Sequence, residues 1–518
     1  MRVSRLLVLG SVLASIPMFA LACGSDDAKT NNTPPGSGGS TSGGAPGSGS
    51  GGKATTGGAG VTGVTGGAGV TGGAGVTGGA GVTGGAGVTG GAGGAGVTGG
   101  AGVTGGAPPV VDCDLSGTGK VREALPLEIT SDMTLTNDKV WTIGGFVHVK
   151  NGATLTIPKC TRLEGTQTPI GVLVITRGSK LIADGTADEP ILFTSPKAPG
   201  ARAAGDWGGV VLLGKANNNN PGGEALIEAT PAITDNTYGG GLTPDDADNS
   251  GTLRYVRIEF AGYELAADKE VNGLTLGAVG SGTTLSHIEV SNGRDDCFEW
   301  FGGTVNADHL ICNTDGDDTF DTDRGYRGTV QYAFGRKFAN PSKDPQGFEW
   351  DNYDANNAAT PKNQPIFKNI TLCGYGVNVD GAATKGPSFA GVFRKGIGPA
   401  SIDSWVATGF DYGIDFRDAV DPTFSITNSF FFGMFKGTGD QVIAPTTDPN
   451  AETGVDELTL FKKEGAGNVA ADAGPFTAAE CNQDGAPAAS VTSYTAKGAF
   501  AAGSNWQLGK KWVDWSKN

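Results

Sequence analysis

The stretch Asp295-Asp296-Cys297-Phe298-Glu299 recurs along the chain, and this recurrence decides the fold. It returns 22 residues later as Asp317-Asp318-Thr319-Phe320-Asp321. A third copy, Gly347-Phe348-Glu349-Trp350, follows 28 residues after the second, and Gly413-Ile414-Asp415-Phe416 is a looser fourth. Self-similarity of this length is typical of a solenoid, in which each repeat buries its apolar face against its neighbours.

The segments that precede these copies repeat as well. An apolar pattern with spacings of 3 and 2 residues begins at Leu285 and at Phe367, and Ile288, Leu310 and Tyr332 lie 22 and 22 residues apart. A unit of this length with two or three short strands matches one coil of a parallel β-helix, and longer gaps indicate inserted loops. We therefore predict an all-β, single-stranded, right-handed parallel β-helix over residues 108–440. A β-sandwich would also suit short strands, but it does not explain the fixed register.

Residues 441–518 differ in composition from the repeats. They are rich in Ala and Gly and end in Trp506, Trp512 and Trp515. A solenoid must cover its last open coil. We expect this region to form the C-terminal cap, with the three tryptophans as part of it.

The amino-terminal residues 1–22 have the features of an export signal. Arg2 and Arg5 precede an apolar run that ends at Ala22-Cys23-Gly24. Small residues before a cysteine resemble the lipobox of bacterial lipoproteins, which implies that Cys23 is lipidated and anchors the protein to the membrane. Gly24 does not resemble an inner-membrane retention residue, so we expect the outer membrane and the cell surface. The alternative is an ordinary signal peptide with a chance cysteine.

Residues 23–107 form a Gly-rich, low-complexity linker. From Gly57 to Ala107 the chain consists of 17 triplets that each begin with Gly. Gly at every third position is the collagen signature, but this tract has no Pro and many triplets contain a second Gly. We expect a disordered tether on a monomer, and the alternative is a trimeric stalk.

Charge and cysteine content restrict the function. A net charge of −16 gives no basic footprint, so we expect no nucleic-acid partner. No C-x-x-C pair occurs, which argues against a zinc or iron–sulfur site. An even number of further cysteines in an exported chain predicts up to three disulfides of unknown connectivity. The candidates are Cys113, Cys160, Cys297, Cys312, Cys373 and Cys481.

The repeat places Glu299, Asp321 and Glu349 at one position of three successive coils. We expect their side chains to point outward, about 5 Å apart in a ladder, while the flanking aromatic residues point inward. Like charges so close must be compensated. Calcium, which prefers six to eight oxygen ligands, is one candidate. The full candidate metal set is Asp295, Asp296, Glu299, Asp317, Asp318, Asp321, Asp323 and Glu349.

The acids of the ladder could also be compensated by arginine or used in catalysis. Arg294, Arg324 or Arg327 could neutralise them in an ordinary salt-bridge network. Alternatively, a pair of carboxyl groups could act in catalysis, because adjacent coils match the spacing of a retaining glycosidase. Aromatic residues near the ladder, if exposed, could stack on sugar rings, but residues of this kind more often cover the edge of a coil. These residues are Phe301, Tyr326 and Tyr353.

Several stretches resemble a largely uncharacterised family of secreted and lipoprotein β-helices of Gram-negative bacteria. They are residues 178–186, 205–209, 255–260, 298–305 and 323–328. The resemblance covers residues 120–518 and implies a fold and a location but no agreed activity. A second likeness is to polygalacturonases, through Asn313-Thr314-Asp315 and Asp295-Asp296-Cys297. These two motifs come in reverse order, and no Gly-His-Gly or Arg-Ile-Lys motif follows them, so no hydrolase residues are assigned.

Taken together, these features predict a surface lipoprotein that binds an extracellular polysaccharide or another surface component without catalysis, with calcium as a structural cofactor. One alternative is a polysaccharide lyase or glycoside hydrolase that uses the carboxylate ladder. Another is a purely structural envelope protein.

Overall fold

The computed structural model describes residues 113–228, 230–266, 269–337, 346–377, 387–418, 420–436, 456–501, 506–507 and 510–516. The expected export signal, Cys23 and the Gly-rich linker lie outside the described residues. The described residues, from 113 onward, belong to one folded unit.

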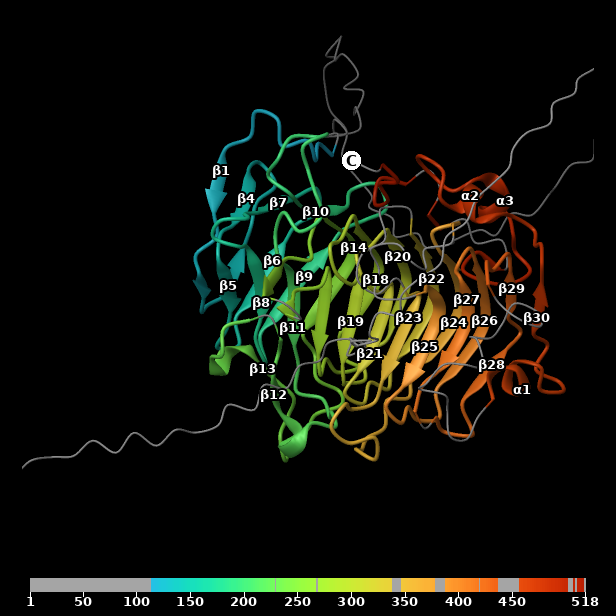
Figure 1. Cartoon of the computed structure of the whole chain (residues 1–518). Helices are drawn as coiled ribbons and strands as arrows, with labels where there is room; N and C mark the ends of the chain where they lie inside the picture. Colours follow the sequence, from blue (N-terminus) through green and yellow to red (C-terminus); the bar gives the residue numbers. More distant parts are fainter. Residues whose placement is uncertain are drawn as a thin grey trace, which may run out of the picture. The chain divides into compact units, whose positions relative to one another are not determined.

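The chain coils into a right-handed parallel β-helix whose strands form two long parallel sheets (Figure 1). The small sheet has ten strands. They are β2 (Glu128–Ile129), β5 (Phe146–Val149), β8 (Val172–Ile175), β11 (Gly209–Leu213), β17 (Leu274–Gly277), β19 (Phe298–Phe301), β21 (Phe320–Asp323), β23 (Phe348–Asp351), β25 (Phe389–Arg394) and β27 (Tyr412–Phe416). The prediction of an all-β parallel β-helix is confirmed.

The large sheet has sixteen strands. Its main path is β1 (Arg122–Ala124), β4 (Val140–Ile143), β7 (Arg162–Gly165), β10 (Ile191–Thr194), β14 (Gly251–Glu259), β18 (Thr284–Ser291), β20 (Ala307–Asn313), β22 (Thr329–Arg336), β24 (Ile366–Cys373), β26 (Ser401–Thr408), β29 (Phe430–Phe432) and β30 (Val469–Ala471). Four strands join it at the side: β3 (Met133–Thr134), β6 (Thr154–Ile157), β9 (Lys180–Asp184) and β28 (Ser425–Thr427). Two hairpins protrude from the coils, β12 (Ala225–Leu226) with β13 (Thr237–Tyr238) and β15 (Glu264–Ala266) with β16 (Lys269–Glu270).

Alternation along each strand places aromatic side chains inside the helix. Phe298, Trp300, Phe348 and Trp350 are fully buried in the main core. Equivalent rings stack from coil to coil, with centroids 5.6 Å apart between Phe298 and Phe320. The inward direction expected for these residues is confirmed, and it leaves the intervening acids on the outer side of the small sheet, where Glu299 is nevertheless buried, at 6% exposed.

The register confirms the ladder, with one correction elsewhere. Glu299 pairs with Asp321, and Asp321 pairs with Glu349. Leu310, however, pairs with Ala333 and not with Tyr332. The prediction that Leu310 and Tyr332 occupy equivalent positions of successive coils is therefore wrong. The physical reason is one additional residue in the turn between β21 and β22, which moves the next strand on by one position.

The long strands of the large sheet bend at one equivalent residue in each coil. Strand β14 pairs with β9 in its first half and with β10 in its second half, so a long strand replaces two short ones. At the bend, Tyr255, His287, His309 and Tyr332 have φ values of 53°, 55°, 55° and 59°. Left-handed backbone is uncommon for such residues, and here it recurs in register. As a result, the side chains at the bend form a column.

The carboxyl-terminal region departs from the expected cap. Strand β30 continues the large sheet beyond residue 440. Helix α1 (Glu457–Phe461) packs on β27 and β28 of the last coils, where the Phe416 backbone N–H donates to the Glu457 carboxylate at 3.0 Å. The tryptophans lie elsewhere: Trp512 donates its backbone N–H to Ala187 at 3.2 Å, beside the middle of the large sheet. The expectation that these tryptophans cover the last coil is wrong.

The six cysteines pair as expected into three disulfides, Cys113–Cys160, Cys297–Cys312 and Cys373–Cys481. The third ties the end of β24 to α2 (Ala478–Cys481), which is followed by α3 (Ala489–Thr492). All helices in the described part of the chain are too short to cross a membrane.

Candidate metal centre

The outer surface of β19, β21 and β23, with the turns that lead into them, carries the predicted metal set. We call this surface the acidic face, and its members are Asp295, Asp296, Glu299, Asp317, Asp318, Asp321, Asp323 and Glu349. The 22-residue repeat brings these acids together, because it places equivalent residues on successive coils. The repeat therefore explains why these acids lie on one side of three neighbouring coils.

Carboxylate oxygens converge in two overlapping groups on the acidic face. One oxygen each from Asp295, Asp296 and Asp317 lies within 4.8 Å of the others, and the same is true of Asp296, Glu299 and Asp321. Calcium binds oxygen ligands at about 2.3–2.6 Å, so two oxygens that bind one ion lie at most about 5 Å apart. These residues therefore fit a calcium ion, with Asp296 common to both groups.

Burial makes these acids costly to ionise. Burial and the neighbouring carboxylates Glu228 and Asp321 raise the pKa of Glu299 well above its ordinary value. Burial, followed by Glu349 and Asp323, does the same to the pKa of Asp321, although a hydrogen bond to Glu299 opposes the shift. Oδ1 of Asp321 is buried without a hydrogen-bond partner among the described residues. A cation would satisfy this oxygen and offset the repulsion.

Two of the acids also support the coil. Asp296 accepts the backbone N–H of Asp318 at 2.8 Å, and Asp318 accepts that of Gln346 at 3.0 Å. Gln346 continues the column by accepting the N–H of Phe389 at 2.7 Å. Each side chain thus satisfies a backbone donor of the next coil, which holds Asp296 in place between the two groups of ligands.

The structure compensates one end of the face with an arginine that the sequence analysis missed. Arg394 contacts Glu349 at 2.7 Å and Asp351 at 2.6 Å. It belongs to β25, whose segment carries no copy of the acidic repeat, so no sequence signal marked it. Of the ladder residues, Glu349 is therefore ion-paired, in contrast to the carboxylates of Glu299 and Asp321.

The three arginines that the sequence proposed as partners compensate the acidic face only in part. Arg324 contacts Asp323 at 3.1 Å and Asp354 at 3.3 Å, at the edge of the acidic face. Arg327 pairs with Asp246, and Arg294 pairs with Glu264. None of the described ion pairs joins these three guanidinium groups to the two groups of converging acids, although the positive charge of Arg294 acts to lower the pKa of Asp295.

The aromatic residues considered for stacking on sugar rings are not available for it. Tyr326 is fully buried, and Phe301 and Tyr353 are 3% and 6% exposed. Tyr326 donates its hydroxyl to the Val305 carbonyl at 2.8 Å, and Arg324 lies over the ring of Tyr353 at 4.6 Å. Their burial agrees with the other interpretation, in which these rings cover the edge of the coil.

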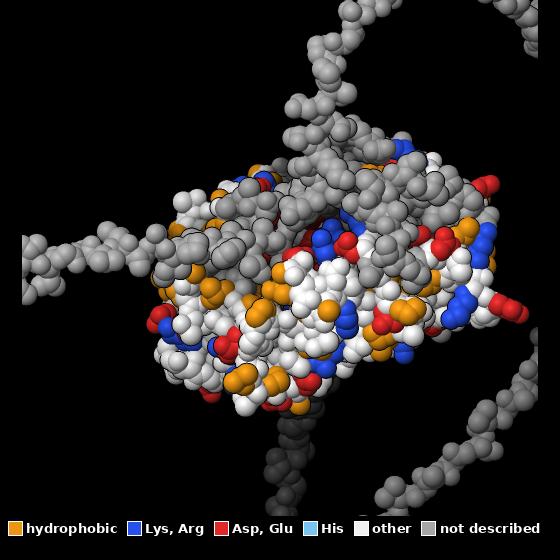
Figure 2. Space-filling view, turned by 60° about the horizontal axis from the view of Figure 1, so that its bottom comes forward, with side chains coloured by type: hydrophobic (Ala, Val, Ile, Leu, Met, Phe, Trp, Pro, Cys, Tyr) orange, Lys and Arg blue, Asp and Glu red, His pale blue; other side chains and the backbone are white. Residues whose placement is uncertain are grey.

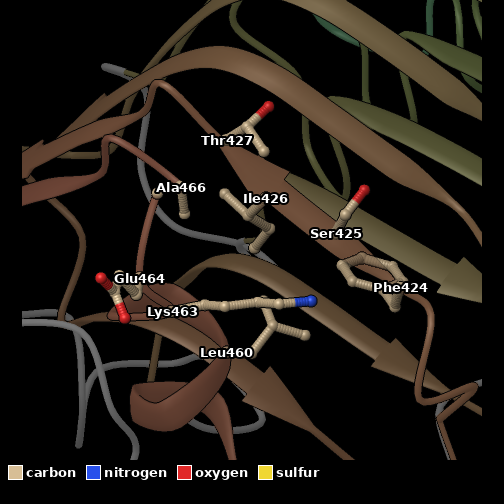
Figure 3. A pocket seen from close by; sticks show the side chains of 9 residues that line it. Phe424, Ser425, Ile426, Thr427, Leu460, Lys463, Glu464 and Ala466 are labelled. Atoms are coloured by element: carbon tan, nitrogen blue, oxygen red, sulfur yellow. The ribbon is translucent and has the colours of Figure 1, made fainter.

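A pocket of about 210 Å³ lies at the last coils, between β28 and the segment that follows α1 (Figure 3). Phe424, Ile426 and Leu460 make it largely apolar, and Lys463 extends across it toward Phe424. Glu464 points away from the pocket. The other polar residues that line it are Ser425, Thr427 and Glu464, so this pocket gathers fewer charged groups than the acidic face.

The surface seen in Figure 2 mixes acidic, basic and hydrophobic side chains over its described part. Opposite charges that alternate in this way give weak long-range fields. The acidic face differs, because its acids belong to three neighbouring strands and bring few basic residues with them. Unbalanced charge is therefore a local property of the acidic face.

Stacked parallel coils with an outward row of carboxylates define a parallel β-helix with a candidate cation-binding face. A family model described as a pectate-lyase-like β-helix domain matches residues 127–476, and the chain belongs to this family. The match agrees with the likeness to pectin-active β-helices and points to a carbohydrate-related function. No curated protein and no solved structure matches the chain.

Proposed function

We propose that this protein binds an extracellular polysaccharide at the acidic face through calcium, without catalysis. The observation that carries the proposal is the convergence of Asp296, Glu299 and Asp321 within 4.8 Å, with no arginine between them in the described ion pairs. Membership of a pectate-lyase-like family supports a carbohydrate as the ligand. Calcium bound by three or four carboxylates keeps free positions, which hydroxyl or carboxylate groups of a glycan can fill.

Calcium suits this site better than other metals. All the ligand atoms on the acidic face are carboxylate oxygens, which hard cations prefer, and the nearby Cys297 and Cys312 are consumed by their disulfide. Magnesium demands a near-ideal octahedron and retains its waters, whereas calcium accepts the irregular ligand sets that stacked coils provide.

A second candidate function is glycan cleavage. The hydrogen bond between Asp321 and Glu299 makes them a carboxyl pair of which one member holds a proton. Adjacent coils lie about 5 Å apart, near the separation of about 5–5.5 Å that retaining glycosidases use, but the hydrogen bond brings these two carboxyl groups closer together than that. The cleavage hypothesis predicts turnover that is lost in Glu299→Gln, whereas the binding hypothesis predicts none.

We further propose that Cys23 carries a lipid and that the linker holds the domain at the outer surface of the outer membrane. Two or more acyl chains suffice for stable anchoring. Cys23→Ala should release the protein from the membrane fraction, and external protease should remove the domain from intact cells. A domain that is protected from protease would contradict the surface location.

The central experiment measures calcium and glycan binding together. Isothermal titration with calcium should show saturable binding, and chelator should lower the urea midpoint, because a ligand at 100 times its Kd stabilises by about 2.7 kcal/mol. A panel of acidic and neutral polysaccharides is then tested for binding to the protein. At least one should bind in the presence of calcium and be released by chelator, without new reducing ends or unsaturated products.

Variants connect these effects to the acidic face. Asp321→Asn should abolish calcium binding, while Asp184→Asn should retain it, because Asp184 lies on β9 and pairs with Arg254 at 2.7 Å. Full calcium binding by Asp321→Asn would refute the site. Calcium binding without retention of any polysaccharide would refute the ligand and leave the metal centre.

A further inference from the structure

A second group of metal-ligand side chains lies on the large sheet, apart from the acidic face. His287 belongs to β18, and Asp308 and His309 belong to β20. One ring nitrogen from each histidine and one oxygen of Asp308 all lie within 4.8 Å of one another. The chain has only 3 histidines, so two of them meet at this point.

The bend in each coil explains why the two histidines meet. Both have left-handed backbone at φ 55°, and their rings stack with centroids 4.2 Å apart and planes 12° apart. Tyr255 and Tyr332 extend the column on either side, with centroids 4.4 and 5.1 Å from the neighbouring imidazole. The repeat therefore presents equivalent edges of the two imidazoles side by side.

Asp308, the residue before His309 in β20, completes the group. Its carboxylate hydrogen-bonds to Nδ1 of His309 and lies 4.0 Å from Nδ1 of His287. Ser286, its partner in register, donates its hydroxyl to Asp308 at 2.7 Å and lies 2.8 Å from Nδ1 of His287. Both imidazoles thus direct Nδ1 toward one carboxylate.

We propose that His287, His309 and Asp308 bind a divalent transition-metal ion of the Zn²⁺ or Cu²⁺ type. Imidazole with carboxylate is a donor set for these ions and not for calcium. Tetrahedral zinc with bonds of about 2.0–2.1 Å needs ligand atoms about 3.3 Å apart, which rotation of the side chains provides. The Asp308 side chain is 46% exposed, so the ion can enter from solvent and keep one open position.

Two tryptophans border this site. The ring centroid of Trp506 lies 5.0 Å from that of His309, and Trp512 lies 5.3 Å from His287, both edge-on. They restrict solvent on one side and hold the imidazoles in their stacked orientation. A metal ion would therefore link two coils of the sheet under the carboxyl-terminal segment.

The test uses full-length protein carrying an affinity tag without histidine. One equivalent of Cu²⁺ should give an electron paramagnetic resonance spectrum with hyperfine splitting from two imidazole nitrogens, and a large excess of Zn²⁺ should weaken that spectrum by competing for the site. Asn tolerates left-handed backbone, so His287→Asn and His309→Asn should keep the fold while weakening Cu²⁺ binding at least tenfold each. Asp308→Asn should also weaken it.

His148→Asn is the matched control and should leave the Cu²⁺ spectrum unchanged. His148 is the third histidine, buried and hydrogen-bonded to Asn236 at 2.8 Å. An unchanged spectrum in the double variant His287→Asn/His309→Asn, or no stoichiometric Cu²⁺ binding by the wild-type protein, would overturn the proposal. In either case the ring column would serve only to dock the tryptophans. Retained calcium binding in the same variants would separate this site from the acidic face.

Discussion

Asp321→Asn should stabilise the metal-free protein, although it removes a carboxylate that the sequence repeats. Asn has the same shape and can donate a hydrogen bond to Glu299, the present partner of Asp321. The substitution removes one negative charge from a group whose oxygens lie within 4.8 Å of one another. Loss of a charge that is buried among like charges favours the folded state.

The size of this effect depends on the distance between the charges. At 4.8 Å and an effective dielectric constant of about 20, two unit charges repel by about 3 kcal/mol. The wild-type acids avoid part of this repulsion by holding protons, so we expect a gain of roughly 1–2 kcal/mol in the free energy of unfolding.

The pH dependence has a defined sign. Because the pKa of Asp321 is raised in the folded state, its stabilising contribution is present at low pH and is lost as pH rises through the folded-state value. The variant should therefore exceed the wild type most at pH 8, and the difference should vanish near pH 4, where Asp321 is protonated in the folded protein.

Urea denaturation with chelator at pH 4, 6 and 8 measures this difference. Asp184→Asn should show the opposite sign at pH 8, a loss below about 1 kcal/mol, since it breaks an exposed ion pair with Arg254. Destabilisation of Asp321→Asn at pH 8, or a gain that grows as pH falls, would refute the argument that the acids on this face repel one another.

Three further substitutions test the packing and the ion pairs. Arg394→Met should lower the free energy of unfolding by roughly 3 kcal/mol, because it removes the cation that Glu349 and Asp351 share. The exposed Arg254→Met should lower it by less than about 1 kcal/mol. Equal losses for the two variants in urea denaturation would contradict this. Trp300→Ala should cost about 3–5 kcal/mol through a cavity among stacked rings, whereas Leu242→Ala, 94% exposed, should stay within about 0.5. Removing the disulfide Cys373–Cys481, which spans 108 residues, should lower the free energy of unfolding by roughly 1–2 kcal/mol more than removing Cys297–Cys312, which spans 15. Calorimetry of the two double-alanine variants measures the difference, and the reverse order of stability would contradict this expectation.

The repeat was sufficient to predict the fold and the acidic face, because a register of 22 residues converts sequence position directly into a place on a coil. It failed where a turn changed length: one additional residue before β22 replaced Tyr332 by Ala333 as the partner of Leu310. Turn lengths depend on local backbone geometry, which an apolar pattern does not record.

Contacts made by segments without a repeat could not be read from the sequence. Arg394 pairs with Glu349 from a strand that breaks the acidic pattern, and Trp512 reaches Ala187 across more than 300 residues of chain. The stacked histidines are a different case. His287 and His309 lie 22 residues apart, so the period that aligned the acids also aligned them, and that spacing was a usable signal.

The two sheets treat buried charge differently, and this contrast is the strongest reason to expect a cation on the acidic face. On the large sheet, the buried carboxylate of Glu164 is contacted by Arg122 and Arg162 at 2.8 Å each. On the small sheet, three successive coils place Glu299, Asp321 and Glu349 in register, and among the described ion pairs of these three acids an arginine contacts only Glu349. Solubility alone would not require acids buried beside one another, since exposed carboxylates serve that purpose at lower cost. Places where a chain departs from such a general rule are expected to be functional sites. If chelated and calcium-loaded protein unfold at the same urea concentration, calcium does not compensate the acids of the small sheet.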